Sequence, residues 1–188
     1  LGSFTLPNWV IIVFMGALGF GVRGLDALVQ DGYEIAGVIT APDKPAGRGR
    51  KLKASPVKTY ASEQNLNILQ PKNLKSAQFL EALKGLNANL FIVVAFRMLP
   101  EVVWSMPKYG TFNLHGSLLP NYRGAAPINW AIINGEKKTG LTTFFLKHEI
   151  DTGEILLQQE TDIGSDITAG ELHDILMDMG ADLVLETV

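Results

Sequence analysis

The chain has 188 residues, of which 47% are hydrophobic and 19% are charged, and its formal net charge at pH 7 is −3. This composition excludes a disordered or fibrous chain, and the length suits one large domain. The net charge excludes a polycation that would coat nucleic acid or an anionic membrane with its whole surface. The absence of cysteine excludes disulfides, thiolate metal ligands and a cysteine nucleophile, and it favours a cytoplasmic location.

The predicted elements alternate between strand and helix. A β-branched, apolar run opens the pattern, and serine residues that cap free backbone N–H groups mark the start of two helices. In chain order we expect a strand at 10–15, a helix ending at Gly32, a strand at 35–40, a helix at 56–64, a strand at 68–70, a helix from Ser76, a strand at 90–95, a short helix after Pro100, a strand at 111–115, a helix at 126–134, a strand at 141–146, an edge strand at 155–159 and a helix at 168–186. This order predicts an α/β fold, a doubly wound and mostly parallel sheet with helices on both faces, in which substrates bind beyond the carboxyl ends of the strands.

The beginning of the chain is predicted not to enter a membrane. The uncharged stretch 9–21 is much shorter than the roughly 20 residues of a spanning helix, and it is interrupted by Gly16 and Gly19. No basic region precedes it, so it is not a signal peptide either. Residues 1–8 are interpreted as a flexible leader or a remnant of cloning, and residues 9–188 as one folded domain.

The stretch after the strand at 111–115 carries the candidate chemistry. Asn113 and His115 are two positions apart at a strand end, so both side chains are expected on the same face of the sheet. An amide that stabilises negative charge and an imidazole that moves protons can act together on one carbonyl. Asp151, in a turn-rich loop after the strand at 141–146, is the best candidate for an orienting carboxylate and is expected at the same sheet edge. The alternative is an ordinary polar pair at a strand end.

Other polar and glycine-rich stretches give weaker signals. The other histidines, His148 and His173, are interpreted as solvated or capping residues, and no histidine and carboxylate spacing resembles a zinc motif, so we expect no metal. The glycines after the first strand are spaced G-x-x-G-x-G, with Leu18 where a phosphate turn needs glycine. This spacing disfavours a nicotinamide or flavin site.

A strongly basic segment lies between a predicted strand and helix. The loop 43–53 holds five cations and one anion on a scaffold rich in glycine and proline. Such a loop can follow a phosphate backbone, and binding through it should then weaken with salt. The alternative is a solvated surface loop without a ligand.

The sequence resembles the 10-formyltetrahydrofolate-dependent formyltransferases. The resemblance is carried by Asn113-x-His115 and by the runs 117–120, 122–128 and 151–154. The Arg-Gly-Ala-Ala-Pro-Ile run and the basic loop resemble the branch that acts on methionyl-initiator-tRNA more than the glycinamide-ribonucleotide or sugar branches. The resemblance implies a Rossmann-like formyltransferase fold and a formyltransferase catalytic domain at 9–188.

The resemblance also implies roles for individual residues. Asn113 would bind the formyl oxygen as it becomes an oxyanion, His115 would pass a proton from the attacking amine to the leaving nitrogen, and Asp151 would hold the imidazole. The co-substrate would be 10-formyltetrahydrofolate, with its pterin surrounded by Ala95, Phe96, Arg97, Met98, Leu99 and Ile150. Contacts to methionyl-initiator-tRNA would come from Lys44, Arg48, Arg50, Lys51 and Arg123.

The chain departs from the family pattern at three places. Ala17-Leu18-Gly19 replaces the usual Thr-Pro turn after the first strand, and Gly116 stands where alanine is common. The C-terminal β-barrel domain of the family is expected to be absent, and the chain is expected to be a monomer with no membrane contact. The alternatives left open are an N-formyltransferase for an amino sugar or nucleotide, a formyltetrahydrofolate hydrolase, and a fragment that binds folate or RNA without catalysis.

Overall fold

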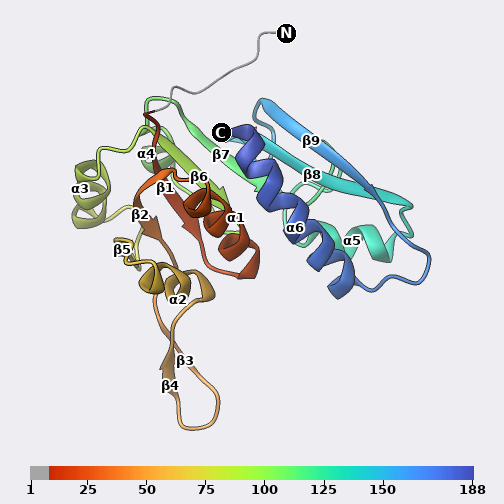
Figure 1. Cartoon of the computed structure of the whole chain (residues 1–188), viewed down its shortest axis with the longest axis horizontal. Helices are drawn as coiled ribbons and strands as arrows, with labels where there is room; N and C mark the ends of the chain where they lie inside the picture. Colours follow the sequence, from red (N-terminus) through yellow and green to blue (C-terminus); the bar gives the residue numbers. More distant parts are fainter. Residues whose placement is uncertain (1–8) are drawn as a thin grey trace.

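The computed structural model describes residues 9–188, so the leader expected at 1–8 lies outside the described residues. A seven-stranded sheet in the order β5-β2-β1-β6-β7-β8-β9 forms its centre (Figure 1). Its parallel strands are β1 (Ile11–Gly16), β2 (Glu34–Ile39), β5 (Ile68–Leu69), β6 (Leu90–Val94) and β7 (Thr111–His115). The antiparallel strands β8 (Lys138–Phe145) and β9 (Ile155–Asp162) extend one side. The predicted α/β fold with a mostly parallel sheet is confirmed.

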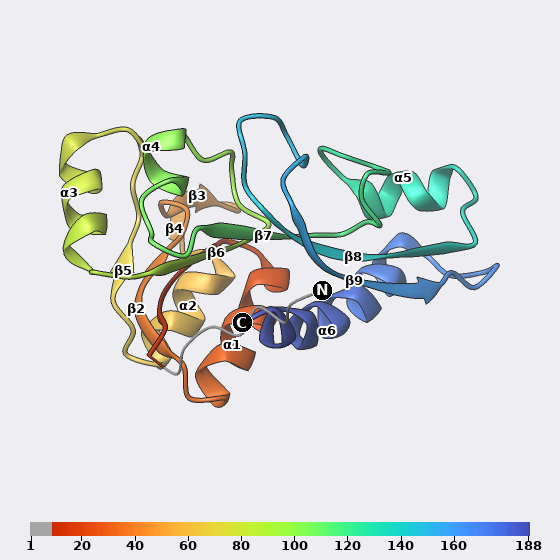
Figure 2. The same ribbon diagram turned by 90° about the horizontal axis from the view of Figure 1, so that it is seen from above.

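Helices cover both faces of the sheet, as the alternation of elements predicts (Figure 2). One face is covered by α1 (Gly19–Gln30), α2 (Pro56–Glu63) and α6 (Ala169–Thr187), and the other by α3 (Ala77–Gly85) and α4 (Glu101–Trp104). The helix α5 (Pro127–Ile133) follows β7 and contacts α6.

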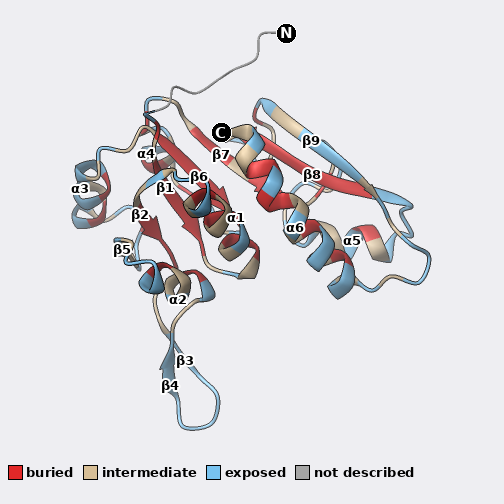
Figure 3. Cartoon of the chain, in the orientation of Figure 1, coloured by how far each residue is buried: buried red, intermediate tan, exposed pale blue. Residues whose placement is uncertain are grey.

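The buried strand β1 divides the core into two layers. Ile12 and Phe14 pack with α1 and α6, whereas Val13 and Met15 pack with α3 and α4, and all four are fully buried (Figure 3). Successive side chains of a strand point to opposite faces, so a strand between two helical layers must be apolar throughout. This requirement explains the continuous apolar run of the sequence.

Serine residues begin two of the helices, as expected. The Ser55 hydroxyl accepts a hydrogen bond from the Lys58 backbone N–H at 3.1 Å, and the Ser76 hydroxyl accepts one from the Phe79 N–H at 3.2 Å. Each hydroxyl satisfies a backbone donor that has no partner within the helix. Thr168 caps α6 in the same way through the Glu171 N–H.

Close packing explains two glycines, one at the end of β1 and one in the first turn of α1. A Cβ atom on Gly16 would lie 2.9 Å from the Val94 carbonyl oxygen, and one on Gly21 would lie 3.1 Å from Cγ2 of Val57. The start of α1 therefore approaches β6 and α2 more closely than a residue with a side chain would permit.

The basic segment is a hairpin, which the sequence prediction of a loop missed. The strands β3 (Lys44–Ala46) and β4 (Lys51–Lys53) pair antiparallel and project away from the sheet (Figure 1). Gly47, Gly49 and Arg50 have φ values of 71°, 93° and 50° and form the turn. The prediction was wrong because lysine and proline have low strand propensity and because the segment shows no apolar alternation.

Candidate active site

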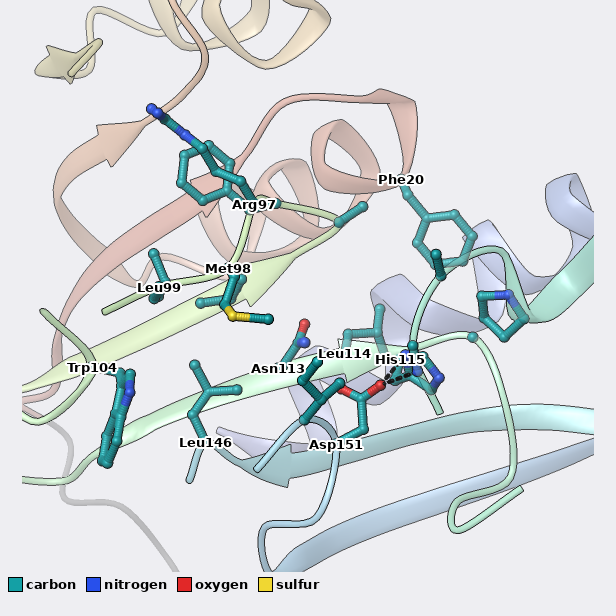
Figure 4. A pocket seen from close by; sticks show the side chains of 18 of the residues that line it. Phe20, Arg97, Met98, Leu99, Trp104, Asn113, Leu114, His115, Leu146 and Asp151 are labelled. Atoms are coloured by element: carbon teal, nitrogen blue, oxygen red, sulfur yellow. Dashed lines mark hydrogen bonds and ion pairs between the residues drawn. The ribbon is translucent and has the colours of Figure 1, made fainter. Parts of the chain in front are cut away.

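A cavity of about 760 Å³ opens where the parallel strands β6 and β7 end (Figure 4). Sites of this fold class form in that place, beyond the carboxyl ends of the strands. The cavity brings together all the residues predicted to act in catalysis or to bind folate, namely Asn113, His115, Asp151, Ala95, Phe96, Arg97, Met98, Leu99 and Ile150.

The loop that carries Asp151 reaches the cavity by an unexpected route. Because β8 is antiparallel to β7, its last residue Phe145 lies beside Phe112, and the Leu146 N–H donates to the Thr111 carbonyl at the start of β7. Asp151 does lie beside His115, as expected, but the strand before it ends at the opposite edge of the sheet. Residues 147–151 instead fold back across the sheet face and return the carboxylate to His115 (Figure 4).

His115 is buried, with 8% of its surface exposed, and its two ring nitrogens have different neighbours. Nε2 lies 2.8 Å from the backbone carbonyl oxygen of Tyr122, and Nδ1 lies 3.7 Å from Oδ2 of Asp151. A carbonyl oxygen can only accept, so Nε2 carries a proton and donates. The 3.7 Å separation permits an ion pair when the ring carries both protons, and it is longer than a hydrogen bond.

Asp151 is held mainly by backbone. Its Oδ2 atom accepts a hydrogen bond of 2.7 Å from the Gly124 N–H, and its side chain is 10% exposed. The φ of Asp151 is 52°, in the left-handed region that aspartate visits more readily than most residues. Such backbone conformations cost of order 1 kcal/mol or more and cluster at binding and catalytic sites.

The amide of Asn113 has an unused hydrogen-bonding group. Its Oδ1 atom is buried and has no hydrogen-bond partner within residues 9–188. A buried polar atom without a partner costs about 1–3 kcal/mol, so this amide is a group to which a ligand can bond. Rotation of the amide by 180° exchanges its oxygen and its NH₂ group, so the same position can accept or donate.

The rest of the cavity wall is largely apolar. Met98 and Ile150 are 72% and 53% exposed, an unusual degree for large hydrophobic side chains, and they line the opening. Arg97 donates to the backbone carbonyls of Pro71 and Lys72, and its guanidinium lies 5.2 Å from the centre of the Phe96 ring. The cavity thus combines a polar end with an apolar wall that suits a flat, aromatic ligand.

The residues predicted to contact tRNA fall into two groups. Four of them lie on the hairpin, away from the cavity, and the fifth lies on the loop between β7 and α5, next to Gly124. All five side chains belong to exposed residues, and none takes part in an ion pair within residues 9–188: Lys44, Arg48, Arg50, Lys51 and Arg123.

The single anion of the basic segment, Asp43, lies at the base of the hairpin, where its charge is neutralised by Lys58. Asp43 pairs with Lys58 at 2.8 Å and accepts a hydrogen bond of 2.8 Å from Gln70. These two hydrogen bonds, with Lys58 the stronger influence, lower the pKa of Asp43 from its ordinary value. The cations of the hairpin therefore face solvent without a compensating charge from Asp43.

Several residues of the cavity were missed by sequence reasoning. The missed side chains Phe20, Trp104 and Leu146 carry no polar signal. His148 was expected to be solvated; it is exposed, but it also pairs with Glu101 at 3.3 Å and meets the Trp104 ring edge-on. In the sequence, Gly124 is only one residue of the run 122–128, and the fold reveals that its N–H holds Asp151.

Residues 9–188 contain neither a cluster of metal ligands nor a membrane-spanning helix. No group of three or more histidine, aspartate or glutamate side chains is placed to hold a metal ion. No helix in this part of the chain is long and apolar enough to cross a membrane.

The chain is similar to proteins of one family over almost its whole length. The family model described as Formyl transferase matches residues 9–188. A methionyl-tRNA formyltransferase of Flavobacterium psychrophilum is 65% identical over 178 residues, with 94% of this chain and 56% of that protein covered. The corresponding protein of Bacteroides thetaiotaomicron is 61% identical over 177 residues, covering 94% and 55%. The chain thus spans a little more than half the length of these relatives.

Solved structures show the same fold at much lower identity. A phosphoribosylglycinamide formyltransferase from Bacillus halodurans superposes with a TM-score of 0.80 at 19% identity, covering 94% of this chain and 92% of that one. The sugar 3N-formyl transferase WlaRD superposes with a TM-score of 0.68 at 22% identity, covering 96% and 62%. These likenesses confirm the Rossmann-like formyltransferase fold. The family model that matches residues 9–188 confirms the family resemblance seen in the sequence, and the chain belongs to the formyl transferase family.

Proposed function

We propose that the chain transfers a formyl group from 10-formyltetrahydrofolate to the α-amine of methionyl-initiator-tRNA. The observation that carries this proposal is the meeting of Asn113, His115 and Asp151 at one cavity. The acceptor is inferred from relatives that are 55–65% identical and are named methionyl-tRNA formyltransferase. The exposed cations of the hairpin support an acceptor that carries phosphates.

Each of the three polar side chains has a defined role in this proposal. The acceptor amine attacks the formyl carbon, a new C–N bond forms, and the formyl oxygen becomes an oxyanion that the Asn113 amide stabilises by donating a hydrogen bond. His115 takes the proton that the amine loses and delivers it to N10 of the folate as the old C–N bond breaks. Asp151 faces the ring nitrogen that gains and loses this proton. Atoms and charges balance without a covalent enzyme intermediate.

The folate is proposed to lie along the apolar wall. Ala95, Phe96, Met98, Leu99 and Ile150 provide apolar contacts, and the cavity volume of about 760 Å³ suits a ligand of this size. Arg97 contributes by holding Phe96 and the backbone at Pro71 and Lys72. The exposure of Met98 and Ile150 is consistent with a surface that a planar ring system covers.

The tRNA is proposed to bind across the space between the hairpin and the cavity. Lys44, Arg48, Arg50 and Lys51 would contact phosphates from one side, and Arg123 would contact them close to the reacting amine. Phosphate contacts of this kind fix orientation and do not read bases.

The monomeric state and the cytoplasmic location remain predictions. Light scattering of the purified chain tests the monomeric state.

A comparison of acceptors tests the proposal. The purified chain is incubated with 10-formyltetrahydrofolate and, in separate reactions, with methionyl-tRNA, a nucleotide-linked amino sugar or no acceptor. We expect formylmethionyl-tRNA as the main product. Preference for the sugar would move the chain to the alternative substrate class, and formate release without an acceptor would indicate a hydrolase. Folate binding with no product in any reaction would make it a binding module.

A further inference from the structure

The loop between β7 and α5, residues 116–126, contacts both ionisable groups of the site. His115 and Asp151 do not share a hydrogen bond, since Nδ1 and Oδ2 are 3.7 Å apart. Each is bonded to the loop backbone instead, His115 through the Tyr122 carbonyl at 2.8 Å and Asp151 through the Gly124 N–H at 2.7 Å. The loop therefore sets the relative position of the two groups.

We infer that Tyr122 is a positioning residue for His115. The side-chain hydroxyl of Tyr122 holds its own backbone carbonyl in place, and this carbonyl selects which nitrogen of the His115 ring is protonated. This inference rests on the proposed formyl transfer for its catalytic consequence. It concerns a residue whose own side chain does not line the cavity. The choice of the His115 tautomer is a property of the protein without substrate, so it can be tested independently of catalysis.

The backbone of Tyr122 needs support to stay in place. Its φ is 56°, in the left-handed region that is uncommon for bulky side chains, and Gly124 and Ala126 nearby have φ values of 86° and 53°. Glycine adopts this conformation readily, but Tyr122 and Ala126 carry side chains that disfavour it. Such a segment persists only where contacts around it hold it.

The side chain of Tyr122 provides that support. Its hydroxyl donates a hydrogen bond of 2.7 Å to Oε1 of Glu136 and accepts one of 3.1 Å from Nδ2 of Asn134. Asn134 is the C-cap residue of α5, and Glu136 lies two residues beyond it. The hydrogen bond to Glu136 raises the pKa of Tyr122, so the hydroxyl remains a donor at neutral pH. The apex of the loop is thereby tied to the end of α5.

The first half of the loop has a separate anchor. The buried Thr142 hydroxyl donates to the Ser117 carbonyl at 2.7 Å and accepts from the Leu119 N–H at 3.1 Å, while the Ser117 hydroxyl donates to the Asn121 carbonyl at 2.7 Å. These contacts end just before Tyr122. Loss of the Tyr122 hydroxyl should therefore free the apex without unfolding the start of the loop.

The held carbonyl has a chemical consequence. Because it only accepts, it keeps the proton on Nε2 and leaves Nδ1, which faces Asp151, as the nitrogen that exchanges protons with substrate. If the carbonyl moves away, both neutral tautomers become accessible, and the form with the proton on Nδ1 cannot act as a base there. The expected loss is in kcat, because the folate wall at 95–99 is untouched.

The test compares Tyr122→Phe with Tyr60→Phe as a matched control. Tyr60 also donates to a carboxylate, Asp26, at 2.7 Å, and burial together with that hydrogen bond raises its pKa to about 12. It belongs to α2 and lies outside the cavity lining. Nitrogen-15 NMR of the His115 ring identifies the tautomer, and steady-state kinetics gives kcat and KM for the folate donor.

We expect the wild-type chain and Tyr60→Phe to show the Nε2-protonated ring, and Tyr122→Phe to show a mixture of tautomers. We expect kcat to fall about tenfold in Tyr122→Phe with KM for the donor nearly unchanged. Glu136→Ala, a change at an exposed side chain, should reproduce both effects. Glu136→Gln, which keeps an acceptor oxygen, should recover most of the loss.

The outcomes separate this inference from the proposed function. An unchanged tautomer in both Tyr122→Phe and Glu136→Ala overturns the inference, as does an equal loss of kcat in Tyr60→Phe. A wild-type chain that forms no formylmethionyl-tRNA overturns the proposed function, while the NMR comparison still decides whether Tyr122 sets the tautomer. If Tyr122→Phe does not fold, Glu136→Ala and Glu136→Gln carry the same comparison.

Discussion

The cavity and the basic hairpin are built on opposite physical principles. In the cavity, His115 is buried, the Asp151 side chain is only 10% exposed, and each is held by one backbone hydrogen bond, of 2.8 and 2.7 Å. On the hairpin, the charged side chains are exposed and none is held in an ion pair within residues 9–188. One region depends on the position of a few groups, and the other depends on the number and sign of its charges.

The difference follows from what each region is proposed to bind. A reacting carbonyl develops charge at one atom, so the groups that stabilise it must be placed within a few tenths of an ångström. A phosphate backbone is a long, uniform array of charge, and long flexible cations can follow it in many arrangements. Substitutions should therefore have large, position-specific effects in the cavity and small, additive effects on the hairpin.

The largest effect is expected for Asn113→Ala. Removal of an amide that donates to a developing oxyanion lowers kcat by about a hundredfold to a thousandfold. Because the Asn113 Oδ1 atom has no hydrogen-bond partner within residues 9–188, its loss should leave the fold intact, and the thermal midpoint should not fall. Steady-state formyl transfer and a thermal melt measure the two quantities. Asn67→Ala, at an exposed position, is the control, and an equal kcat in the two variants would remove Asn113 from the mechanism.

The next effect, on stability, is expected for Gly153→Ala. A Cβ atom at this position would lie 1.4 Å from the Phe145 carbonyl oxygen, so the backbone of the loop that carries Asp151 would have to move. Overpacking of this kind costs about 3 kcal/mol of the free energy of unfolding, which urea denaturation measures. Gly164→Ala is the matched control, since no atom lies within 4 Å of its added Cβ, and it should change stability by less than about 0.5 kcal/mol. Similar losses in both variants would show that the close approach at Gly153 does not matter.

The residues of the cavity also show what can be predicted from the sequence and what cannot. The shared face of Asn113 and His115 follows from the two-residue period of a strand, and the buried strands follow from their apolar runs. The path of the loop to Asp151 depends on the reversed direction of β8, for which the chain carries no local signal. The Tyr122 carbonyl is a backbone group that every residue type possesses, so only the fold could reveal that it holds His115.

A third, smaller effect should appear in the salt dependence of tRNA binding. Replacement of Arg48 and Lys51 by glutamine would remove two of the proposed phosphate contacts and should reduce the slope of log affinity against log salt by about two. Filter binding or fluorescence anisotropy at several salt concentrations gives the slope. The control is the Lys84→Gln and Lys137→Gln pair, which changes the net charge equally at exposed positions off the hairpin. Equal slopes for the two double variants would mean that the hairpin acts only through net charge.

The smallest effect concerns the base of the hairpin. The Lys58 and Gln70 hydrogen bonds lower the pKa of Asp43 in the folded chain, so their stabilising contribution is complete above the unfolded value of about 4 and is lost as the pH falls through the lower, folded pKa. Asp43→Asn should therefore speed amide hydrogen exchange at 44–53 at neutral pH and leave the core strands unchanged.

An NMR titration of the Asp43 carboxyl checks the sign directly. Its midpoint should lie below about 4, and Lys58→Met should move it back towards that value. A midpoint above 4 would mean that burial outweighs the two hydrogen bonds, and the hairpin would then be held less firmly at neutral pH than at low pH. In that case Asp43, at the base of the hairpin, would resemble the loosely held, exposed residues of the hairpin tip and not the firmly held residues of the cavity.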